Sequence, residues 1–187
     1  MTLASLLAAS AFAAADTFTT TVDVTGLQSD AIRGNVANWV NLLDLGALHA
    51  GYESFVITGL GWDVTLTAND PSWASEMTFA FEETTQAVGV FLTPGVGVDE
   101  PGTGTYSSGG VLDLVGLGLD FALQTDNIVR LEFFESFDDT SVPIDGVVDQ
   151  GLLTIQYEAQ PVPEPATLAA LGVGAAALLR RRKNKKA

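Results

Sequence analysis

The sequence contains no cysteine and very little positive charge outside its C-terminal end. Without cysteine the chain has no disulfide framework, thiolate metal site, redox motif or cysteine nucleophile. Between Asp16 and Glu164 the only basic residues are Arg33 and Arg130. Because phosphate affinity comes mainly from lysine and arginine, this region is not expected to bind nucleic acid.

The acidic residues are confined to the same region. All 23 lie between Asp16 and Glu164, where two arginines against 23 carboxylates leave a net charge of −21. The other six basic residues follow this region: Arg180, Arg181, Arg182, Lys183, Lys185 and Lys186. Such a separation favours cations as partners of the acidic part.

Catalytic signals are also scarce. The single histidine, His49, has no cysteine partner and no Gly-x-Ser-x-Gly elbow, so a hydrolase triad is not supported. With 23 carboxylates some pair will always lie close together, so the presence of such a pair does not indicate a glycosidase. The first candidates for a catalytic pair would be Glu76, Glu132 and Glu135, which lie in or beside apolar strands. We expect a protein that is not an enzyme.

The N-terminal residues have the composition of an export signal. Residues 3–15 form a short apolar, alanine-rich run ending in the small residues that a signal peptidase accepts, and polar Asp16 follows. No basic residue precedes the run, which departs from the usual signal peptide. We interpret 1–15 as a signal peptide; the alternative is a buried N-terminal helix.

The C-terminus consists of three consecutive segments. Val162, Pro163, Glu164 and Pro165 come first, then the uncharged stretch 166–179, then the basic tail 180–187. Prolines hold an extended segment that a protease can bind. The uncharged stretch, roughly 21 Å long as a helix, would only just cross a bilayer core, and the basic tail would stay in the cytoplasm.

This order resembles the PEP-CTERM sorting signal, with Pro163, Glu164 and Pro165 at the motif position. The resemblance implies processing by an exosortase, a membrane protease or transpeptidase that would recognise Glu164. The chain then divides into a signal peptide (1–15), one domain (16–160) and a sorting signal (161–187). A permanent membrane anchor is the alternative.

The body has the pattern of β-strands. Apolar and polar residues alternate at 62–67 and 76–82, and strand-like runs also occur at 17–25, 86–92, 111–115, 119–123, 128–134 and 152–157. Gly59-Leu60-Gly61, 69–71 and the glycine-rich stretch 94–110 are interpreted as separators. We predict an all-β, antiparallel, jelly-roll-like sandwich, with 29–48 as a loop or short helix at its edge.

One acidic cluster is a candidate calcium site. Its members lie between two predicted strands: Glu135, Asp138, Asp139, Asp145 and Asp149. Calcium requires six to eight oxygen ligands from a loop that can wrap around it. The spacing matches no EF-hand loop, so a structural Ca²⁺ competes with a solvated acidic loop that prevents strand edges from aggregating.

A second candidate site is aromatic. Trp73 follows a predicted turn and is expected at the surface, where a flat ring could bind a sugar together with Glu76, whereas Trp62 is expected in the core. The alternative is that Trp73 caps the core at the sandwich rim. We predict a non-enzymatic surface or matrix protein. Its association with exopolysaccharide is what the resemblance to the sorting-signal family implies, and no residue of the body indicates it. A carbohydrate-binding or carbohydrate-active domain is the alternative.

Overall fold

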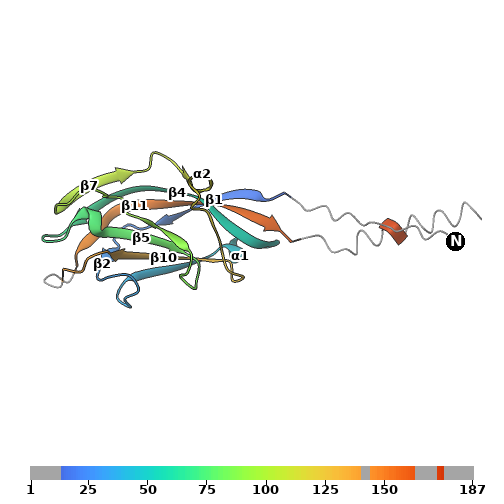
Figure 1. The fold of residues 1–187 in the computed structure, drawn as a ribbon, viewed down its shortest axis with the longest axis horizontal. Helices are drawn as coiled ribbons and strands as arrows, with labels where there is room; N and C mark the ends of the chain where they lie inside the picture. The colour runs from blue at the N-terminus through green and yellow to red at the C-terminus, as the bar shows by residue number, and fades with distance from the viewer. Residues whose placement is uncertain (1–13, 140–143, 163–171, 175–187) are drawn as a thin grey trace, which may run out of the picture.

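Two antiparallel β-sheets form the body of the molecule (Figure 1). The structure is a computed structural model that describes residues 14–139, 144–162 and 172–174. The first sheet contains β1 (Asp16–Asp23), β2 (Gln28–Ser29), β4 (Tyr52–Ala68), β7 (Gly102–Ser107), β8 (Leu112–Asp113), β9 (Phe121–Ala122) and β11 (Gly146–Pro161). The second contains β3 (Trp39–Asp44), β5 (Met77–Glu82), β6 (Gly89–Leu92) and β10 (Ile128–Glu135). The predicted all-β, antiparallel class is confirmed.

Two long strands organise the first sheet. One edge of β11 pairs with β1 and β2, and its other edge pairs with β4 along nearly its whole length. The free edge of β4 then pairs in turn with β7, β8 and β9. The predicted loop at 94–110 therefore contains a strand, β7, because β4 offers an unpaired edge that fixes even a glycine-rich segment.

The second sheet has the order β3, β10, β5, β6. The segment 29–48, predicted as a loop or short helix, supplies β2, β3 and a four-residue helix, α1 (Leu45–Leu48). Its β3 pairs with β10 from Trp39 opposite Phe133 to Asp44 opposite Ile128. Pairing with a neighbouring strand thus outweighs the mixed spacing of this segment, as tertiary context often does.

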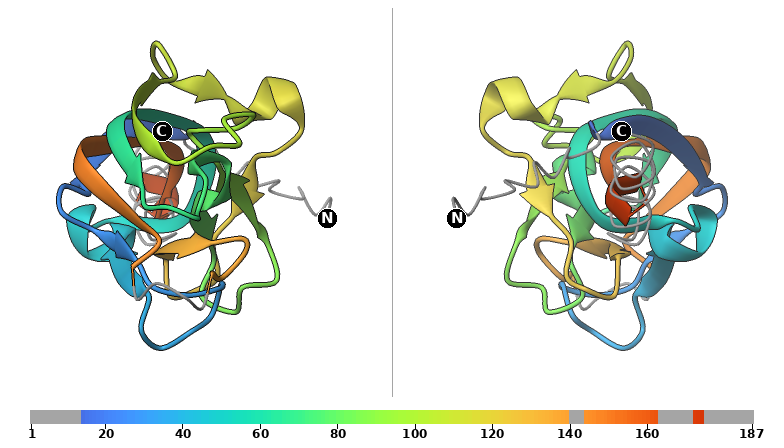
Figure 2. Two further views of the ribbon diagram at one scale, coloured as in Figure 1. Left: turned by 90° about the vertical axis from the view of Figure 1, so that its left-hand side faces the viewer. Right: turned by 90° about the vertical axis from the view of Figure 1, so that its right-hand side faces the viewer.

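The core lies between the two sheets. Phe79 and Phe133 stack at its centre with ring centroids 4.6 Å apart. From the first sheet it receives Phe55, Ile57, Val64, Leu66, Leu153, Ile155 and Tyr157, and from the second Met77, Phe81, Val129 and Leu131. Figure 2 shows the curled strands of both layers in end-on view. The alternating residues of the two inner faces therefore bury one continuous apolar interior.

The outer face of the second sheet is covered as well. All six residues of β5 are buried, although their alternation predicts only one buried face. The segment between β2 and β3 lies over this outer face, where Gly34 and Asn38 donate hydrogen bonds to Glu132 of β10. The prediction of a solvent-exposed face is wrong because a covering loop cannot be recognised from strand periodicity.

The glycines at 59–61 do not separate two strands. Both lie inside β4, in contact range of the segment that follows β7. A Cβ on Gly61 would lie 2.9 Å from the carbonyl oxygen of Gly110, and one on Gly59 would lie 2.5 Å from Cγ1 of Val111. These residues are glycines because another part of the backbone crosses close to the strand, not because the strand ends.

The body begins and ends at the same place. Asp16 at the start of β1 pairs with Ala159 near the end of β11, at the right-hand end of the body in Figure 1. None of the helices within the described ranges has the length and apolar character that a membrane crossing requires. Most of the predicted membrane helix 166–179, and all of the signal peptide before residue 14, lie outside the described residues.

Candidate functional site

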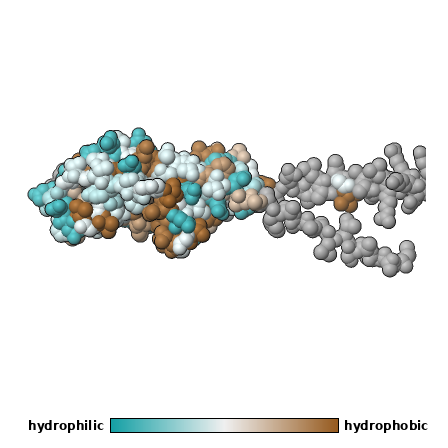
Figure 3. All heavy atoms as spheres, turned by 90° about the horizontal axis from the view of Figure 1, so that it is seen from above, coloured by the Kyte–Doolittle hydropathy of each residue, from teal (hydrophilic) through white to brown (hydrophobic). Residues whose placement is uncertain are grey.

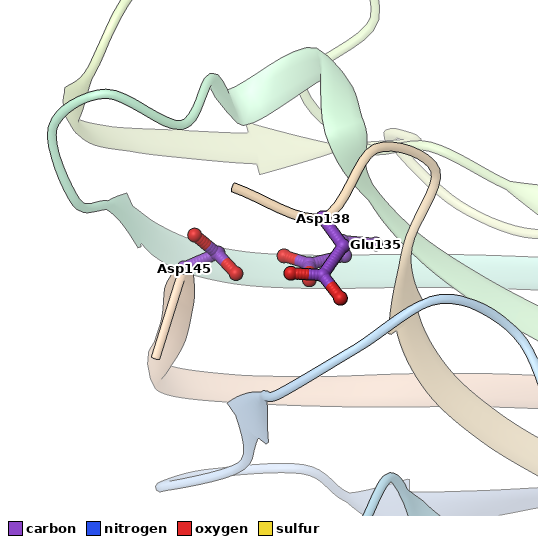
Figure 4. Close-up of side chains that lie close together, drawn as sticks. All are labelled: Glu135, Asp138 and Asp145. Atoms are coloured by element: carbon purple, nitrogen blue, oxygen red, sulfur yellow. The ribbon is translucent and has the colours of Figure 1, made fainter. Parts of the chain in front are cut away.

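Three carboxylates meet at the end of the sandwich opposite the start of β1 and the end of β11. Glu135 is the last residue of β10, Asp138 lies on the segment that follows, and Asp145 immediately precedes β11. One oxygen from each lies within 4.8 Å of the others, and the three side chains converge in Figure 4. We call these three residues the acidic centre. It spans the connection between the two sheets.

Asp145 is held rigidly in this position. Its backbone N–H donates to the carbonyl oxygen of Ser29 at 3.1 Å, and its own carbonyl accepts from the N–H of Asn69 at 2.8 Å. The hydroxyl of Ser72 donates to Oδ1 of Asp145 at 2.5 Å. Two other parts of the chain therefore fix this carboxylate in a fully buried position.

Glu135 is equally constrained by the second sheet. It pairs with Met77 of β5, and its N–H donates to the carbonyl oxygen of Ala31 at 3.2 Å. The next residue, Ser136, donates its N–H to the carbonyl oxygen of Glu76 at 2.9 Å. Glu135 is fully buried, whereas Asp138 remains accessible to solvent. The solvated-loop alternative is therefore wrong for Glu135 and Asp145.

The buried carboxylates lack hydrogen-bond donors. Within the described part of the chain, no donor reaches either carboxylate oxygen of Glu135 or Oδ2 of Asp145, and the buried hydroxyl of Ser29 is also without a partner. Both arginines of the body are engaged elsewhere, with Glu82 and Glu132. Native proteins rarely bury charged groups without compensation, because desolvation is costly.

The proton affinity of Glu135 reflects this environment. Burial, reinforced by the neighbouring Asp145, Asp138 and Glu76, raises the pKa of Glu135 to about 9. Both causes disfavour an additional negative charge. The site therefore requires a positive charge, either a proton or a cation.

The two remaining acidic residues of the predicted calcium set take different positions. Asp139 lies beside the acidic centre, since its Oδ2 is 3.1 Å from Oγ of Ser72, whose single hydroxyl hydrogen is shared with the nearer Asp145. Asp149 lies apart, on a β-bulge where the pairing of β11 with β4 shifts register. Its carboxylate accepts from the Thr67 hydroxyl at 2.6 Å. The bulge turns this side chain away from Asp145, which the sequence spacing does not reveal.

The aromatic candidate is less organised. Trp73 is 42% exposed, as expected for a turn residue. Its backbone N–H, not its indole N–H, donates to Oε2 of Glu76 at 2.8 Å. That bond uses the Glu76 carboxylate to cap a single 3₁₀ turn, η1 (Ala74–Glu76). Trp62 packs against the core, as expected.

A shallow groove lies on the outer face of the first sheet. Its volume is about 450 Å³, and it is lined by Asp23, Thr25, Asp63, Val64, Thr65, Thr105, Gln150, Gly151 and Leu152. Neither Trp73 nor Glu76 takes part. Hydrophilic and hydrophobic residues are interspersed on the face shown in Figure 3.

Sequence reasoning does not identify Ser29, Asn69 and Ser72 as the residues that hold Asp145 in the acidic centre. Asn69 and Ser72 flank Asp70-Pro71, where the sequence predicts only a turn, and Ser29 falls in a predicted loop. Their contribution depends on three chain segments meeting at one end of the sandwich. No local pattern carries that information.

The C-terminal motif is supported by comparison with known families. Residues 161–183 match the family model of the PEP-CTERM protein-sorting motif. The chain carries a PEP-CTERM sorting signal. In the structure β11 ends at Pro161, and the exposed Val162 donates its N–H to the carbonyl oxygen of Gly51 at 2.8 Å. Pro163, Glu164 and Pro165 lie outside the described residues.

The other comparisons add no argument about the body. No curated protein has a matching sequence. Among solved structures, the chain is similar to Desmodium yellow mottle tymovirus, with 14% identity, a TM-score of 0.32 and coverage of 88% of this chain and 99% of the other. The infectious bursal disease virus VP2 subviral particle has 10% identity and a TM-score of 0.32, and the match covers 80% of this chain and 34% of the other. Turnip yellow mosaic virus has 10% identity and a TM-score of 0.27, with coverage of 87% of this chain and 89% of the other. These scores are too low to carry a functional argument.

Proposed function

We propose that this protein is an exported, non-enzymatic component of the bacterial cell surface or extracellular matrix, with a jelly-roll-like body that an exosortase separates from its C-terminal segment. The PEP-CTERM motif at 161–183 carries this proposal. The strongly acidic body, with its two arginines both used in internal ion pairs, suits an extracellular environment rich in cations.

The position of the motif fits such processing. The last strand ends at Pro161, where the matched segment begins, so cleavage beyond Val162 would leave every strand of the body intact. The first strand begins beside the end of the last one, so removal of a signal peptide before Asp16 would also leave the strands complete. Signal peptidase and exosortase would then act at the same end of the body.

The membrane would hold the protein only temporarily. In this proposal the stretch 166–179 crosses the inner membrane and the tail 180–187 stays in the cytoplasm, as the positive-inside rule requires. In this topology the body already lies outside, and cleavage releases it from the membrane, after which an association with exopolysaccharide would retain it.

The first experiment follows processing in cells that possess an exosortase. The full-length chain should yield an exported form without peptides from Leu168 onward in mass spectrometry, whereas Glu164→Ala should retain them. Glu158→Ala, an exposed residue of β11 before the motif, serves as the matched control and should be processed normally. Intact C-terminal peptides in the exported wild-type protein would contradict the proposal.

A carbohydrate-binding body is the second candidate. The groove of about 450 Å³ on the first sheet brings carboxylates, an amide and hydroxyls together, the polar groups that orient sugar rings. A glycan array should then give strong hits that Asp63→Ala weakens. Binding lost instead in Trp73→Ala would locate the sugar at the exposed tryptophan, and no binding at all would remove this candidate.

A further inference from the structure

The geometry points to a calcium ion bound by Glu135, Asp138 and Asp145, which ties the end of β10 in one sheet to the start of β11 in the other. This acidic centre is a site of the folded body and is separate from the sorting function of the C-terminus. Its ligands include the last residue of a strand in one sheet and the residue that precedes a strand in the other, so the ion would act as a cross-link in a protein that has no disulfides.

The unpartnered oxygens are the first argument. Glu135 is fully buried, both of its carboxylate oxygens lack a donor within the described chain, and the side chain is directed at Asp138 and Asp145 (Figure 4). Oδ2 of Asp145 is buried and unpartnered in the same way. A bound cation satisfies all of these lone pairs at once, which a single shared proton does not.

The charge balance is the second argument. Five acidic residues gather here: Glu76, Glu135, Asp138, Asp139 and Asp145. The arginines of the body are bound to Glu82 and Glu132, and the six remaining basic residues all follow position 179. Within the described ranges, no basic side chain compensates this charge, so a divalent cation is the partner that the site lacks.

The ligand chemistry selects a hard ion. All of the candidate ligands are oxygens, and the single histidine packs against Phe18 and Tyr157 instead. Three carboxylates can supply up to six oxygens if each is bidentate, which is within the coordination range of calcium. Magnesium requires a smaller and nearly ideal octahedron and retains several waters. The choice of calcium also agrees with the extracellular location proposed above.

The site is also largely preorganised. Asp145 is fixed through Ser29, Asn69 and Ser72, and Glu135 is fixed by the pairing of β10 with β5. Asp145 immediately precedes β11, so Asp138 is the one ligand of the three that neither belongs to a strand nor adjoins one. Because little order has to be created when the ion binds, most of the binding free energy would stabilise the fold.

The experiment measures calcium binding and thermal stability of the purified full-length protein after treatment with EDTA. We expect one Ca²⁺ per chain in calorimetric titration, and a melting temperature that rises by about 5 to 10 °C when Ca²⁺ exceeds its dissociation constant a hundredfold. Mg²⁺ at the same concentration should have a much smaller effect. No shift with Ca²⁺, or an equal shift with Mg²⁺, would overturn the assignment.

Variants distinguish an ion site from a merely buried carboxylate. Glu135→Gln and Asp145→Asn keep the side-chain shape and should abolish the Ca²⁺-dependent shift. Asp138→Asn, at an accessible position, keeps the fold testable if the buried variants do not fold, and should weaken binding at least about tenfold. Asp149→Asn, on the bulge outside the acidic centre, is the matched control and should respond like the wild type.

Retention of the full shift in Glu135→Gln or Asp138→Asn would refute the site. The measurement uses purified protein, so it does not depend on export. A failure of calcium binding and a failure of C-terminal processing would therefore be seen separately.

Discussion

Two glutamates three residues apart on β10 show how surroundings decide the role of one residue type. Both Glu132 and Glu135 are fully buried, but they lie on opposite faces of the strand. Glu132 accepts hydrogen bonds from the N–H of Gly34 at 2.6 Å and from the amide of Asn38 at 2.8 Å, and pairs with Arg130 at 2.7 Å. Glu135 has no such donors within the described chain. One is a structural anion, and the other is a candidate metal ligand.

The pKa of Glu132 should be visible in the acid stability of the protein. Burial by itself would raise this pKa, but the hydrogen bonds from Asn38 and Gly34 and the ion pair with Arg130 lower it below its ordinary value. A carboxyl with a lowered folded-state pKa contributes stability above its unfolded pKa, near 4.5, and this stability is lost as the pH falls through the folded-state pKa.

We therefore expect Glu132→Gln to reduce the free energy of unfolding by about 2 to 4 kcal/mol at pH 7, because it removes charge-assisted hydrogen bonds and the buried partner of Arg130. The difference from the wild type should shrink as the pH falls below about 5. Urea unfolding at several pH values measures both effects.

The control is Glu158→Gln, at an exposed position of β11, which should change stability by less than about 0.5 kcal/mol. A constant difference between wild type and Glu132→Gln from pH 7 down to pH 3 would contradict the electrostatic explanation.

At the scale of elements, β4 has a special position because it pairs with four other strands along its two edges. Its 17 residues pair with β11 on one edge and with β7, β8 and β9 on the other. The connection between β7 and β8 crosses close to β4 at Gly61. There the side-chain hydroxyl of Ser108 accepts a hydrogen bond from the backbone N–H of Trp62 at 2.9 Å, and the backbone N–H of Ser108 donates to the Trp62 carbonyl. The glycine is therefore a packing requirement.

Gly61→Ala tests this close approach. The added methyl group would lie 2.9 Å from the backbone oxygen of Gly110, so the segment 108–113 has to move away from β4. We expect a loss of stability of about 1 to 3 kcal/mol and faster hydrogen exchange at the amides of this segment. Thr65→Ala, four residues along the same strand, should leave exchange at 108–113 unchanged.

If Gly61→Ala were as stable as the wild type, the crossing of this segment over β4 would have to be looser than the structure indicates. The same substitution also distinguishes the two roles that a glycine could have here. Substitution of a glycine in a turn between two strands would disturb the pairing of those strands. Substitution of a glycine beneath a crossing segment disturbs only that segment.

At the scale of the whole molecule, the two ends of the sandwich differ in chemistry. One end holds an aromatic cluster in which His49 stacks on Phe18 at 4.0 Å and lies 2.7 Å from the hydroxyl of Tyr157. This end is where β1 begins and β11 ends (Figure 1). The other end holds the acidic centre, up to about 50 Å away along β11. Pro161, where the sorting signal begins, and the proposed ion site are therefore at opposite ends of the body.

Calcium should accordingly act locally. We expect Ca²⁺ to slow hydrogen exchange about tenfold or more around Glu135, Ser72 and Asp145, because these segments meet at the proposed site. Amides near His49 and Tyr157 should change much less. Uniform protection of the whole body, or protection only at the aromatic end, would be inconsistent with an ion at the acidic centre.

The sequence by itself determined the features that depend on local order. Alternating apolar residues at 62–67 and 76–82 predict β5 and part of β4, and strand-like runs predict β1 and β10. The order of prolines, apolar stretch and basic tail predicts the PEP-CTERM motif. Both kinds of signal depend on residues that are neighbours in the sequence. The density of carboxylates in 135–149 likewise suffices to predict a candidate calcium site in this connection, although not which of its members converge.

Only the tertiary structure decided which distant residues meet. It placed β3 and β7 on sheet edges, covered the outer face of β5 with the loop before β3, and turned Asp149 away through a bulge while bringing Ser29 and Ser72 to Asp145. Strand pairing between remote segments sets these contacts, and a single local pattern is compatible with many such pairings.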